Sequence, residues 1–159
     1  MIEEWAAALE ATTLAAALRN SVWSYPLVNA AHILGVALLV GSTVPLDLRL
    51  LGVWRSAPLA PLWRVLTRTA GAGLVLAIVF GALLFITRAT EYVASGFFIA
   101  KMIAVGVGIA NALLLRVPPL SPVSAAPHPK TPARLRLAAG LSLAAWLTTL
   151  TLGRLIGYF

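Results

Sequence analysis

The chain has 159 residues, of which 60% are hydrophobic and 11% are charged, and its mean hydropathy is +0.93. This composition excludes an ordinary soluble domain and indicates an integral membrane protein. Lys and Arg number 12 against five Asp and Glu, but in an apolar chain this excess marks cytoplasmic loops rather than a nucleic-acid surface. There is no cysteine, which excludes disulfides, thiolate metal sites and iron–sulfur clusters held by this chain alone.

The N-terminal segment, residues 3–20, is rich in Ala and Leu but carries four charged side chains, too many for a membrane span. On a helix, Ile2, Trp5 and Leu9 share one face. We therefore expect residues 1–23 to form an amphipathic helix at the membrane surface. The start of the chain lacks the basic region of a signal peptide, so we expect the N-terminus to be retained.

Four further stretches are long and apolar enough to cross a bilayer, which takes about 20 helical residues. They cover residues 26–46, 70–87, 96–115 and 137–158. Prolines and arginines interrupt the hydrophobicity over 47–69, and the proline-rich segment 116–133 is expected to be an extended loop. The predicted architecture is all-α: a four-transmembrane-helix bundle with an N-terminal surface helix, forming one membrane domain over residues 1–159.

Basic residues are distributed unequally between the two sides of this bundle. Segments 47–69 and 116–136 lie on one side and carry four basic residues each, whereas the other side has Arg19 and Arg88, with Arg154 close to it. Positively charged loops stay in the cytoplasm. Both basic loops are therefore expected to be cytoplasmic, with both chain termini on the opposite side.

A polar stripe opens the first span. Read on a helix, Tyr25, Asn29, His32, Gly35 and Val36 fall roughly in line. Polar groups are expensive in lipid and normally face protein, a ligand or trapped water. The stripe is therefore the first candidate functional feature of the chain.

Other spans place polar side chains at a similar depth. Counted from the outer ends of their spans, His32 lies about six residues deep, Lys101 and Met102 about five, and Arg154 about four, at about 1.5 Å per residue. If Lys101 and Arg154 point inward, they form a cationic pocket beside His32 in the outer leaflet. Such a pocket suits haem propionates, a quinone carbonyl, a lipid headgroup or a small carboxylate.

Haem b and a quinone are the two cofactors that we weigh for this pocket. The candidate cofactor-binding residues are His32, Asn29, Tyr25, Lys101, Met102 and Arg154. His32 is also the candidate metal ligand. A bis-histidine haem needs two imidazoles, and this chain places one in the membrane. Three ways of ligating a haem iron remain: a His32–Met102 pair, a five-coordinate haem, or two His32 residues across a homodimer.

The same residues also have a purely structural interpretation. A membrane histidine often bonds across a helix interface, Lys101 and Arg154 can reach nearby headgroups, and Met102 can simply pack. Asp47 and Arg49 then form a cap or ion pair at the interface. Under this interpretation the chain is a structural or assembly subunit of a larger membrane complex.

A further alternative is a small anion or metal transporter or channel subunit that uses the pocket as its binding site.

Motifs for the common enzyme classes are absent from the sequence. It contains no Gly-rich phosphate loop, nucleophile elbow, paired carboxylates or metal-binding histidine pair. Catalysis needs a positioned acid, base or nucleophile. We therefore do not expect enzymatic turnover by this chain alone.

Three motifs carry a family resemblance. They are Ser21-x3-Tyr25-Pro26-x2-Asn29-x2-His32-x2-Gly35, Asp47-Leu-Arg-Leu-Leu-Gly52 and Gly153-Arg154-x-Ile156-x-Tyr158. In them, and over nearly its whole length, the chain resembles an uncharacterised bacterial family of small four-helix inner-membrane proteins, a domain of unknown function. The resemblance implies a bacterial inner-membrane location, and the positive-inside rule then predicts periplasmic termini. The family's motif positions in this sequence are Tyr25, Asn29, His32, Asp47, Arg49 and Arg154.

The chain is also loosely similar to four-helix membrane cytochromes of the b561 type and to copper-resistance membrane proteins. Those proteins carry several intramembrane histidines, whereas this chain carries one. The leading expectation is therefore a small inner-membrane protein that binds one haem or quinone-like cofactor and is accessory to electron transfer. Its expected partners are the lipid bilayer and either further copies of itself or a larger membrane complex.

Overall fold

The computed structural model describes residues 1–116 and 131–158, and this part of the chain is helical throughout, without strands. The helices are α1 (Ile2–Glu10), α2 (Thr13–Asn20), α3 (Ser24–Leu51), α4 (Leu59–Thr87), α5 (Ala89–Ala94), α6 (Gly96–Arg116) and α7 (Ala133–Leu155). Among them α3, α4, α6 and α7 are long and apolar enough to cross a membrane. The expected all-α bundle of four membrane helices with a short N-terminal helix is therefore confirmed.

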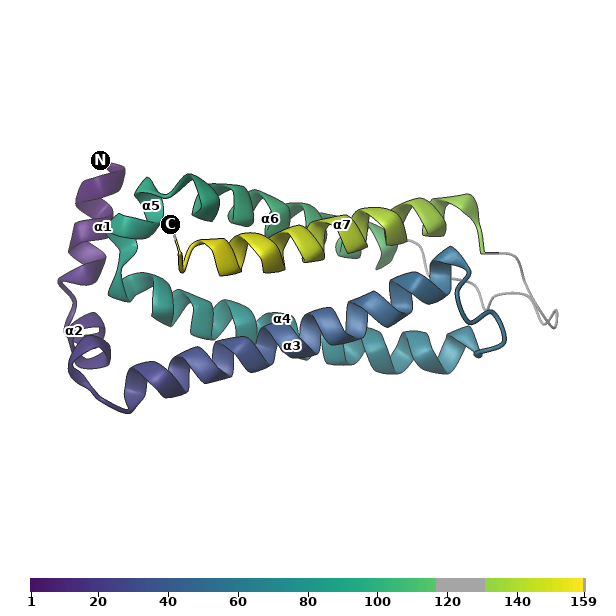
Figure 1. The fold of residues 1–159 in the computed structure, drawn as a ribbon, viewed down its shortest axis with the longest axis horizontal. Helices are drawn as coiled ribbons and strands as arrows, with labels where there is room; N and C mark the ends of the chain where they lie inside the picture. Colours follow the sequence, from purple (N-terminus) through teal and green to yellow (C-terminus); the bar gives the residue numbers. More distant parts are fainter. Residues whose placement is uncertain (117–130, 159) are drawn as a thin grey trace.

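The four long helices form two antiparallel pairs (Figure 1). Helix α3 packs along α4, α6 packs along α7, and the pairs meet where α3 contacts α7. Helices α3 and α7 are close where α3 ends and α7 begins, and they diverge toward the end that carries α1, α2 and α5. The bundle is thus closed at one end, called the closed end below, and splayed at the other, called the splayed end.

Hydrophobic side chains hold the closed end together. Leu46 and Leu50 of α3 pack with Leu135 and Ala139 of α7 in a buried cluster, against which Trp63 of α4 also packs. In water, burying a side chain the size of Leu stabilises a fold by about 1.5–3 kcal/mol. Within a membrane, helices associate mainly through close packing. This cluster is what fixes α7 against α3.

Two glycines allow α3 and α4 to meet at very short range. A Cβ on Gly35 would lie 2.5 Å from the Ala77 nitrogen, and a Cβ on Gly73 would lie 2.5 Å from the Leu39 nitrogen. Small residues at such crossings let two helix backbones approach each other. The crossing also holds the preceding turn of α3 against α4.

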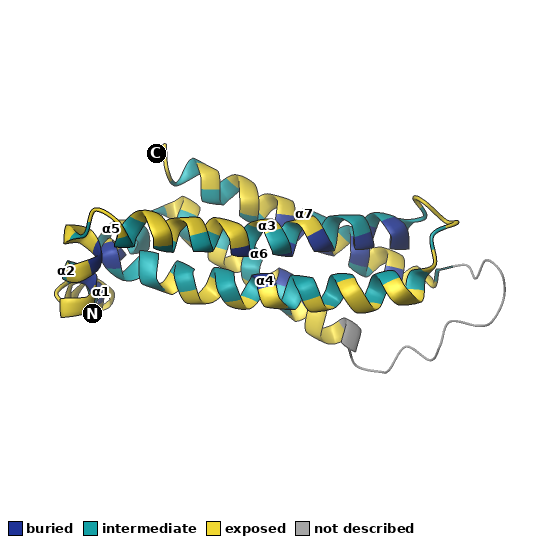
Figure 2. Cartoon of the chain, turned by 90° about the horizontal axis from the view of Figure 1, so that it is seen from below, coloured by how far each residue is buried: buried dark blue, intermediate teal, exposed yellow. Residues whose placement is uncertain are grey.

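Exposed residues run along the outward faces of the long helices (Figure 2). Many of these residues are large and hydrophobic, such as Leu34, Val75 and Ile103. Such a surface would be unfavourable in water but matches the hydrocarbon core of a bilayer. The burial pattern therefore agrees with a membrane protein.

Helices extend further into the predicted 47–69 break than the sequence indicates. Helix α3 passes through Pro45 and ends at Leu51, where Gly52 adopts a left-handed conformation with φ of 109°. Helix α4 already begins at Leu59. The predicted break is thus a short turn between two helices, because helices persist beyond the hydrocarbon and transmembrane helices tolerate proline.

The remaining boundaries differ less from expectation. Helix α6 covers the predicted span 96–115, α7 begins before the predicted 137–158 span, and α5 occupies the link after α4. The N-terminal segment forms two helices rather than one, because the Thr12 hydroxyl accepts the Ala15 N–H and caps α2. Figure 1 shows α1 and α2 lying across the ends of the long helices, as an interfacial segment does. Most of the predicted loop 116–133 lies outside the described residues.

Candidate functional site

His32 lies on the face of α3 that packs against α4. Its Nδ1–H donates to the Ala77 carbonyl oxygen over 2.9 Å, and a Cβ on Gly81 would lie 3.0 Å from its Cε1. A neutral imidazole that donates through Nδ1 keeps its lone pair on Nε2. Because the two nitrogens point in different directions from the ring, Nε2 is directed away from Ala77. His32 therefore links two helices and also offers a hydrogen-bond acceptor.

Lys101 is contributed by the other helix pair. It is half-buried in α6 and lies against α7, where a Cβ on Gly153 would be 3.6 Å from its Nζ. Lys101 thus belongs to the α6–α7 pair, whereas His32 belongs to the α3–α4 pair. An ammonium group donates three hydrogen bonds and accepts none. The splayed half thus combines an acceptor from one pair with a donor from the other.

Tyr25 and Asn29, which begin the polar stripe, lie nearer the splayed end than His32 does. Tyr25 is half-buried in the first turn of α3 and within electrostatic reach of Tyr92 on α5, whose pKa is raised by burial. Asn29 is exposed, one turn from His32. The stripe is therefore not one continuous buried surface: Gly35 and His32 face α4, whereas Asn29 is accessible.

Arg154 contacts Tyr158, and Met102 is turned away from Lys101 around α6. The Arg154 guanidinium donates to the Tyr158 hydroxyl and lies 4.5 Å from the centre of the Tyr158 ring. Its side chain is exposed. Met102 is 42% exposed and, as the residue after Lys101, points about 100° away from it around α6. His32 and Lys101 thus remain as the partly buried acceptor and donor of the splayed half, one from each helix pair.

Asp47 lies at the closed end, far from this pair along α3. It is 5% exposed, Ser142 of α7 bonds to its carboxyl group, and its Oδ2 has no hydrogen-bond partner among the described residues. Arg49 does not pair with Asp47, because its guanidinium donates to the Ala57 and Arg55 carbonyls over 2.8 Å and 3.1 Å. The ion pair considered from the sequence is thus replaced by two separate contacts, one between helices and one with the turn after α3.

A capping layer that the sequence does not reveal covers the splayed end. Glu10 of α1 accepts hydrogen bonds from the Thr90 N–H and hydroxyl, both 2.7 Å long, and these bonds lower the pKa of Glu10. Arg19 of α2 donates to the Thr87 carbonyl at the end of α4 over 3.1 Å. The charges that mark residues 3–20 as interfacial are therefore partly used to attach α1 and α2 to the bundle.

A protein-only metal centre is not found in the described part of the chain. No three His, Cys, Asp or Glu side chains gather there in a way that could hold an ion. If a haem were bound, His32 would offer its iron one imidazole nitrogen, and no contact between His32 and Met102 is found among the described residues. A carbonyl or hydroxyl compound needs only one donor and one acceptor, and it fits the pair better.

Comparison of the chain with protein-family models, curated proteins and solved structures finds no match in any of the three. Its fold class is defined by its own architecture, an α-helical bundle with four candidate membrane-spanning helices. Polar groups held inside such a bundle are the usual sites of function. In the splayed half of this bundle they include His32 and Lys101.

Proposed function

We propose that this is a small inner-membrane protein that binds one quinone-like cofactor between its two helix pairs, as an accessory to electron transfer. The observation that carries the proposal is that His32 and Lys101 lie on different helix pairs in the splayed half, His32 held against Ala77 of α4 and Lys101 lying against Gly153 of α7. A quinone oxygen accepts a hydrogen bond from an ammonium group, and a quinol hydroxyl donates to an imidazole nitrogen. The pair can therefore hold both the oxidised and the reduced ring.

The attachment of His32 to α4 supports this role. Its Nδ1–H bond to Ala77 fixes the ring orientation, as the second nitrogen of functional histidines is commonly fixed by a backbone carbonyl. Gly81 leaves room for the ring edge. A fixed ring presents Nε2 in one direction, so little ordering remains to be done when a ligand binds.

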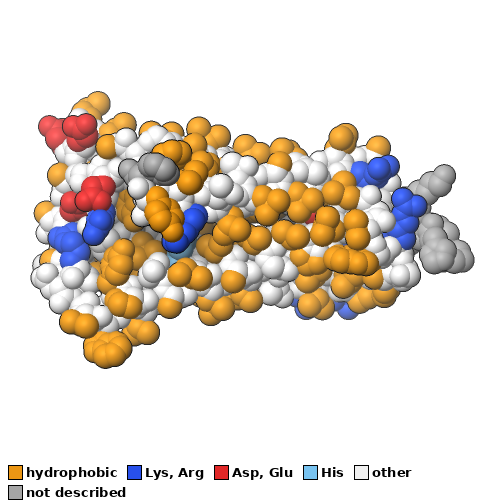
Figure 3. Space-filling view, in the orientation of Figure 1, with side chains coloured by type: hydrophobic (Ala, Val, Ile, Leu, Met, Phe, Trp, Pro, Cys, Tyr) orange, Lys and Arg blue, Asp and Glu red, His pale blue; other side chains and the backbone are white. Residues whose placement is uncertain are grey.

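The charge distribution supports an orientation with both termini in the periplasm. In Figure 3 acidic side chains gather around α1, and several basic side chains lie at the opposite end of the bundle. By the positive-inside rule the closed, basic end is cytoplasmic. The His32–Lys101 pair then lies in the outer leaflet of what the motif resemblance suggests is a bacterial inner membrane.

The Leu46–Leu50 cluster favours a binding site over a transport route. It packs hydrophobic side chains into the contact between α3 and α7 on the cytoplasmic side of the pair, and the polar contact of Asp47 with Ser142 there is itself buried. Ions crossing a bilayer need polar groups along their path. A ligand that enters from the outer leaflet and remains there needs no such path.

The proposal is tested on protein purified from membranes, by mass spectrometry of its organic extract and by ultraviolet–visible spectroscopy. We expect a co-purifying quinone and no Soret band. Lys101→Met should lower quinone occupancy about tenfold, equivalent to about 1.4 kcal/mol of binding. Arg154→Gln is the matched control and should retain the quinone, because Arg154 contacts Tyr158. Wild-type protein without quinone would overturn the proposal, and a Soret band would replace the quinone by haem.

A structural or assembly subunit is the second candidate function, and the His32–Ala77 hydrogen bond beside the Gly35–Gly73 crossing favours it. His32→Asn separates the two functions, because an Asn amide can donate near the Nδ1 position but offers no ring nitrogen at Nε2. Loss of quinone with unchanged thermal stability supports the cofactor site. Lower thermal stability of His32→Ala, in a protein that never carries quinone, supports the structural subunit, because Ala removes the hydrogen bond to Ala77.

A further inference from the structure

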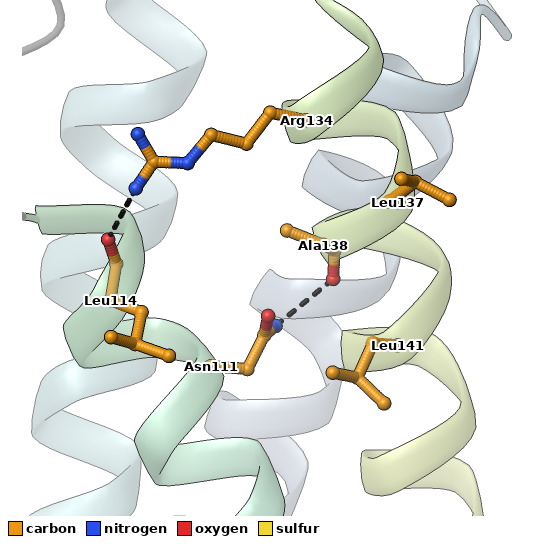
Figure 4. Close-up of a pocket in the computed structure, with 6 residues that line it drawn as sticks. All are labelled: Asn111, Leu114, Arg134, Leu137, Ala138 and Leu141. Carbon is orange, nitrogen blue, oxygen red and sulfur yellow. Dashed lines mark hydrogen bonds between the residues drawn. The ribbon is translucent and has the colours of Figure 1, made fainter.

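A groove of about 300 Å³ runs between α6 and α7 near the closed end of the bundle (Figure 4). The residues that line it are Asn111, Leu114, Arg134, Leu137, Ala138 and Leu141. Its three leucines are partly to largely exposed. Because both helices are candidate membrane spans, these apolar walls face the lipid rather than another helix.

Two hydrogen bonds cross from one wall of the groove to the other (Figure 4). The Asn111 amide donates to the Ala138 carbonyl over 2.9 Å, and the Arg134 guanidinium donates to the Leu114 carbonyl over 3.0 Å. Leu114 lies in the last turn of α6, where carbonyls lack partners within the helix. The second bond therefore holds the Arg134 guanidinium at one end of an apolar groove.

We propose that this groove binds one anionic phospholipid, with its phosphate at Arg134 and an acyl chain along the leucine walls. A phospholipid is the membrane component that combines a negative group with a long apolar chain. Guanidinium groups bind phosphate oxygens well because their N–H groups match the phosphate geometry. Basic pockets between membrane helices on the cytoplasmic side are the usual binding places of anionic headgroups.

The position of Arg134 matches the level of the headgroups. It lies in the first turn of α7, at the basic end of the bundle, while Leu137 and Leu141 follow one and two turns deeper along the same helix. The order along α7 is therefore a charge followed by apolar side chains. This is also the order of groups along a phospholipid that enters the bilayer from the cytoplasmic leaflet.

This site is independent of the proposed quinone site. Lys101 and Gly153 lie at the splayed ends of α6 and α7, whereas Asn111 and Arg134 lie at the other ends of the same helices. Substitutions in the groove should therefore leave quinone occupancy unchanged. Either proposal can fail without affecting the other.

Native mass spectrometry of the full chain from nanodiscs tests the lipid site. We compare discs of phosphatidylcholine that contain a minor fraction of phosphatidylglycerol with discs of phosphatidylcholine alone. Wild-type protein should retain one phosphatidylglycerol molecule with a preference of about tenfold or more over phosphatidylcholine. Arg134→Gln should remove this preference. Equal retention of the two lipids by wild-type protein would overturn the proposal.

The control variant is Arg136→Gln, which makes the same charge change on the same helix. Arg136 is exposed and lies about 200° around α7 from Arg134, so this variant should keep the preference. If Arg134→Gln and Arg136→Gln lost the preference for phosphatidylglycerol equally, the anionic lipid would be attracted by basic residues in general, which would contradict the groove site.

A second substitution tests the apolar part without changing charge. Leu141→Trp fills the groove and should lower retention of the acyl chain while Arg134 is intact. Inorganic phosphate at millimolar concentration should not displace the lipid, because it lacks the chain. Displacement by phosphate alone, or full retention in Leu141→Trp, would rule out a lipid site.

Discussion

Gly35 of α3 and Gly73 of α4 meet backbone to backbone: a Cβ on Gly35 would lie 2.9 Å from the Gly73 oxygen, and a Cβ on Gly73 would lie 2.7 Å from the Gly35 oxygen. Real Cβ atoms do not sit this close to backbone atoms that cannot move. Gly35 of the polar stripe is therefore a point where the two helix backbones are in direct contact. His32 precedes it by one turn and is positioned by the same contact.

Gly35→Ala is expected to destabilise the protein by about 1–3 kcal/mol, the usual cost of forcing extra volume into a close-packed contact. The added methyl group must separate α3 from α4, which also lengthens the His32–Ala77 hydrogen bond. Thermal unfolding in detergent measures the effect. Gly41→Ala on the same helix is the control, because a Cβ there meets nothing within 4 Å. If Gly35→Ala and Gly41→Ala lost similar thermal stability, the tight crossing of α3 and α4 would be contradicted.

Asp47→Asn is expected to leave the protein within about 1 kcal/mol of wild-type stability, because the amide can still bond Ser142 and carries no buried charge. Asp47→Ala should cost about 1–3 kcal/mol, since it leaves the buried Ser142 hydroxyl without this partner. Chemical denaturation of the two variants under the same conditions gives the comparison. If Asn were as damaging as Ala, the negative charge itself would be required at this position.

Docking of α1 on α5 is expected to depend on pH through Glu10. The two hydrogen bonds from Thr90 lower the pKa of Glu10 below its ordinary value of 4.5. Their stabilisation is therefore fully present above about pH 4.5 and is lost as the pH falls through the lower, folded-state pKa. Hydrogen exchange of α1 should accelerate over this acidic range. Glu10→Gln should remove the dependence, and an unchanged profile in that variant would assign it to another group.

Arg49→Lys is expected to loosen the turn between α3 and α4 although the charge is kept. Arg49 uses two guanidinium nitrogens to reach the Ala57 and Arg55 carbonyls, and an ammonium group cannot reproduce that fork. Limited proteolysis within residues 52–58 should become faster. Arg64→Lys is the control, because Arg64 is exposed on α4. Equal cleavage rates in wild-type protein and Arg49→Lys would show that this turn does not depend on Arg49.

Hydropathy alone predicts the four membrane helices, because a span must satisfy its backbone internally and keep its side chains apolar. It places their ends less well. Helix α3 continues past Pro45 and Asp47 to Leu51, since the cue to the end of a helix is a cap such as Gly52 rather than a fall in hydrophobicity. The same limit explains why the predicted 47–69 break is mostly helical.

Depth along a span can also be counted from the sequence, and it is this count that selects His32 and Lys101. Direction around the helix axis is harder to read in an apolar segment, because lipid-facing and protein-facing positions are both hydrophobic. Depth alone therefore leaves open whether Arg154 points inward, and the structure places it against Tyr158. Ser142, as the partner of Asp47, has no comparable signal in the sequence.

The sequence by itself determined that this is an all-α membrane protein, with its spans, its charge asymmetry and a polar stripe around His32. These properties depend on the composition of each segment and on the cost of polar groups in lipid. Only the tertiary structure decided which polar groups meet: Nδ1 of His32 with the Ala77 carbonyl, Arg19 with the Thr87 carbonyl, and Asp47 with Ser142. Such pairings depend on how helices cross and rotate, and that is set by close contacts such as Gly35–Gly73 between residues distant in the chain.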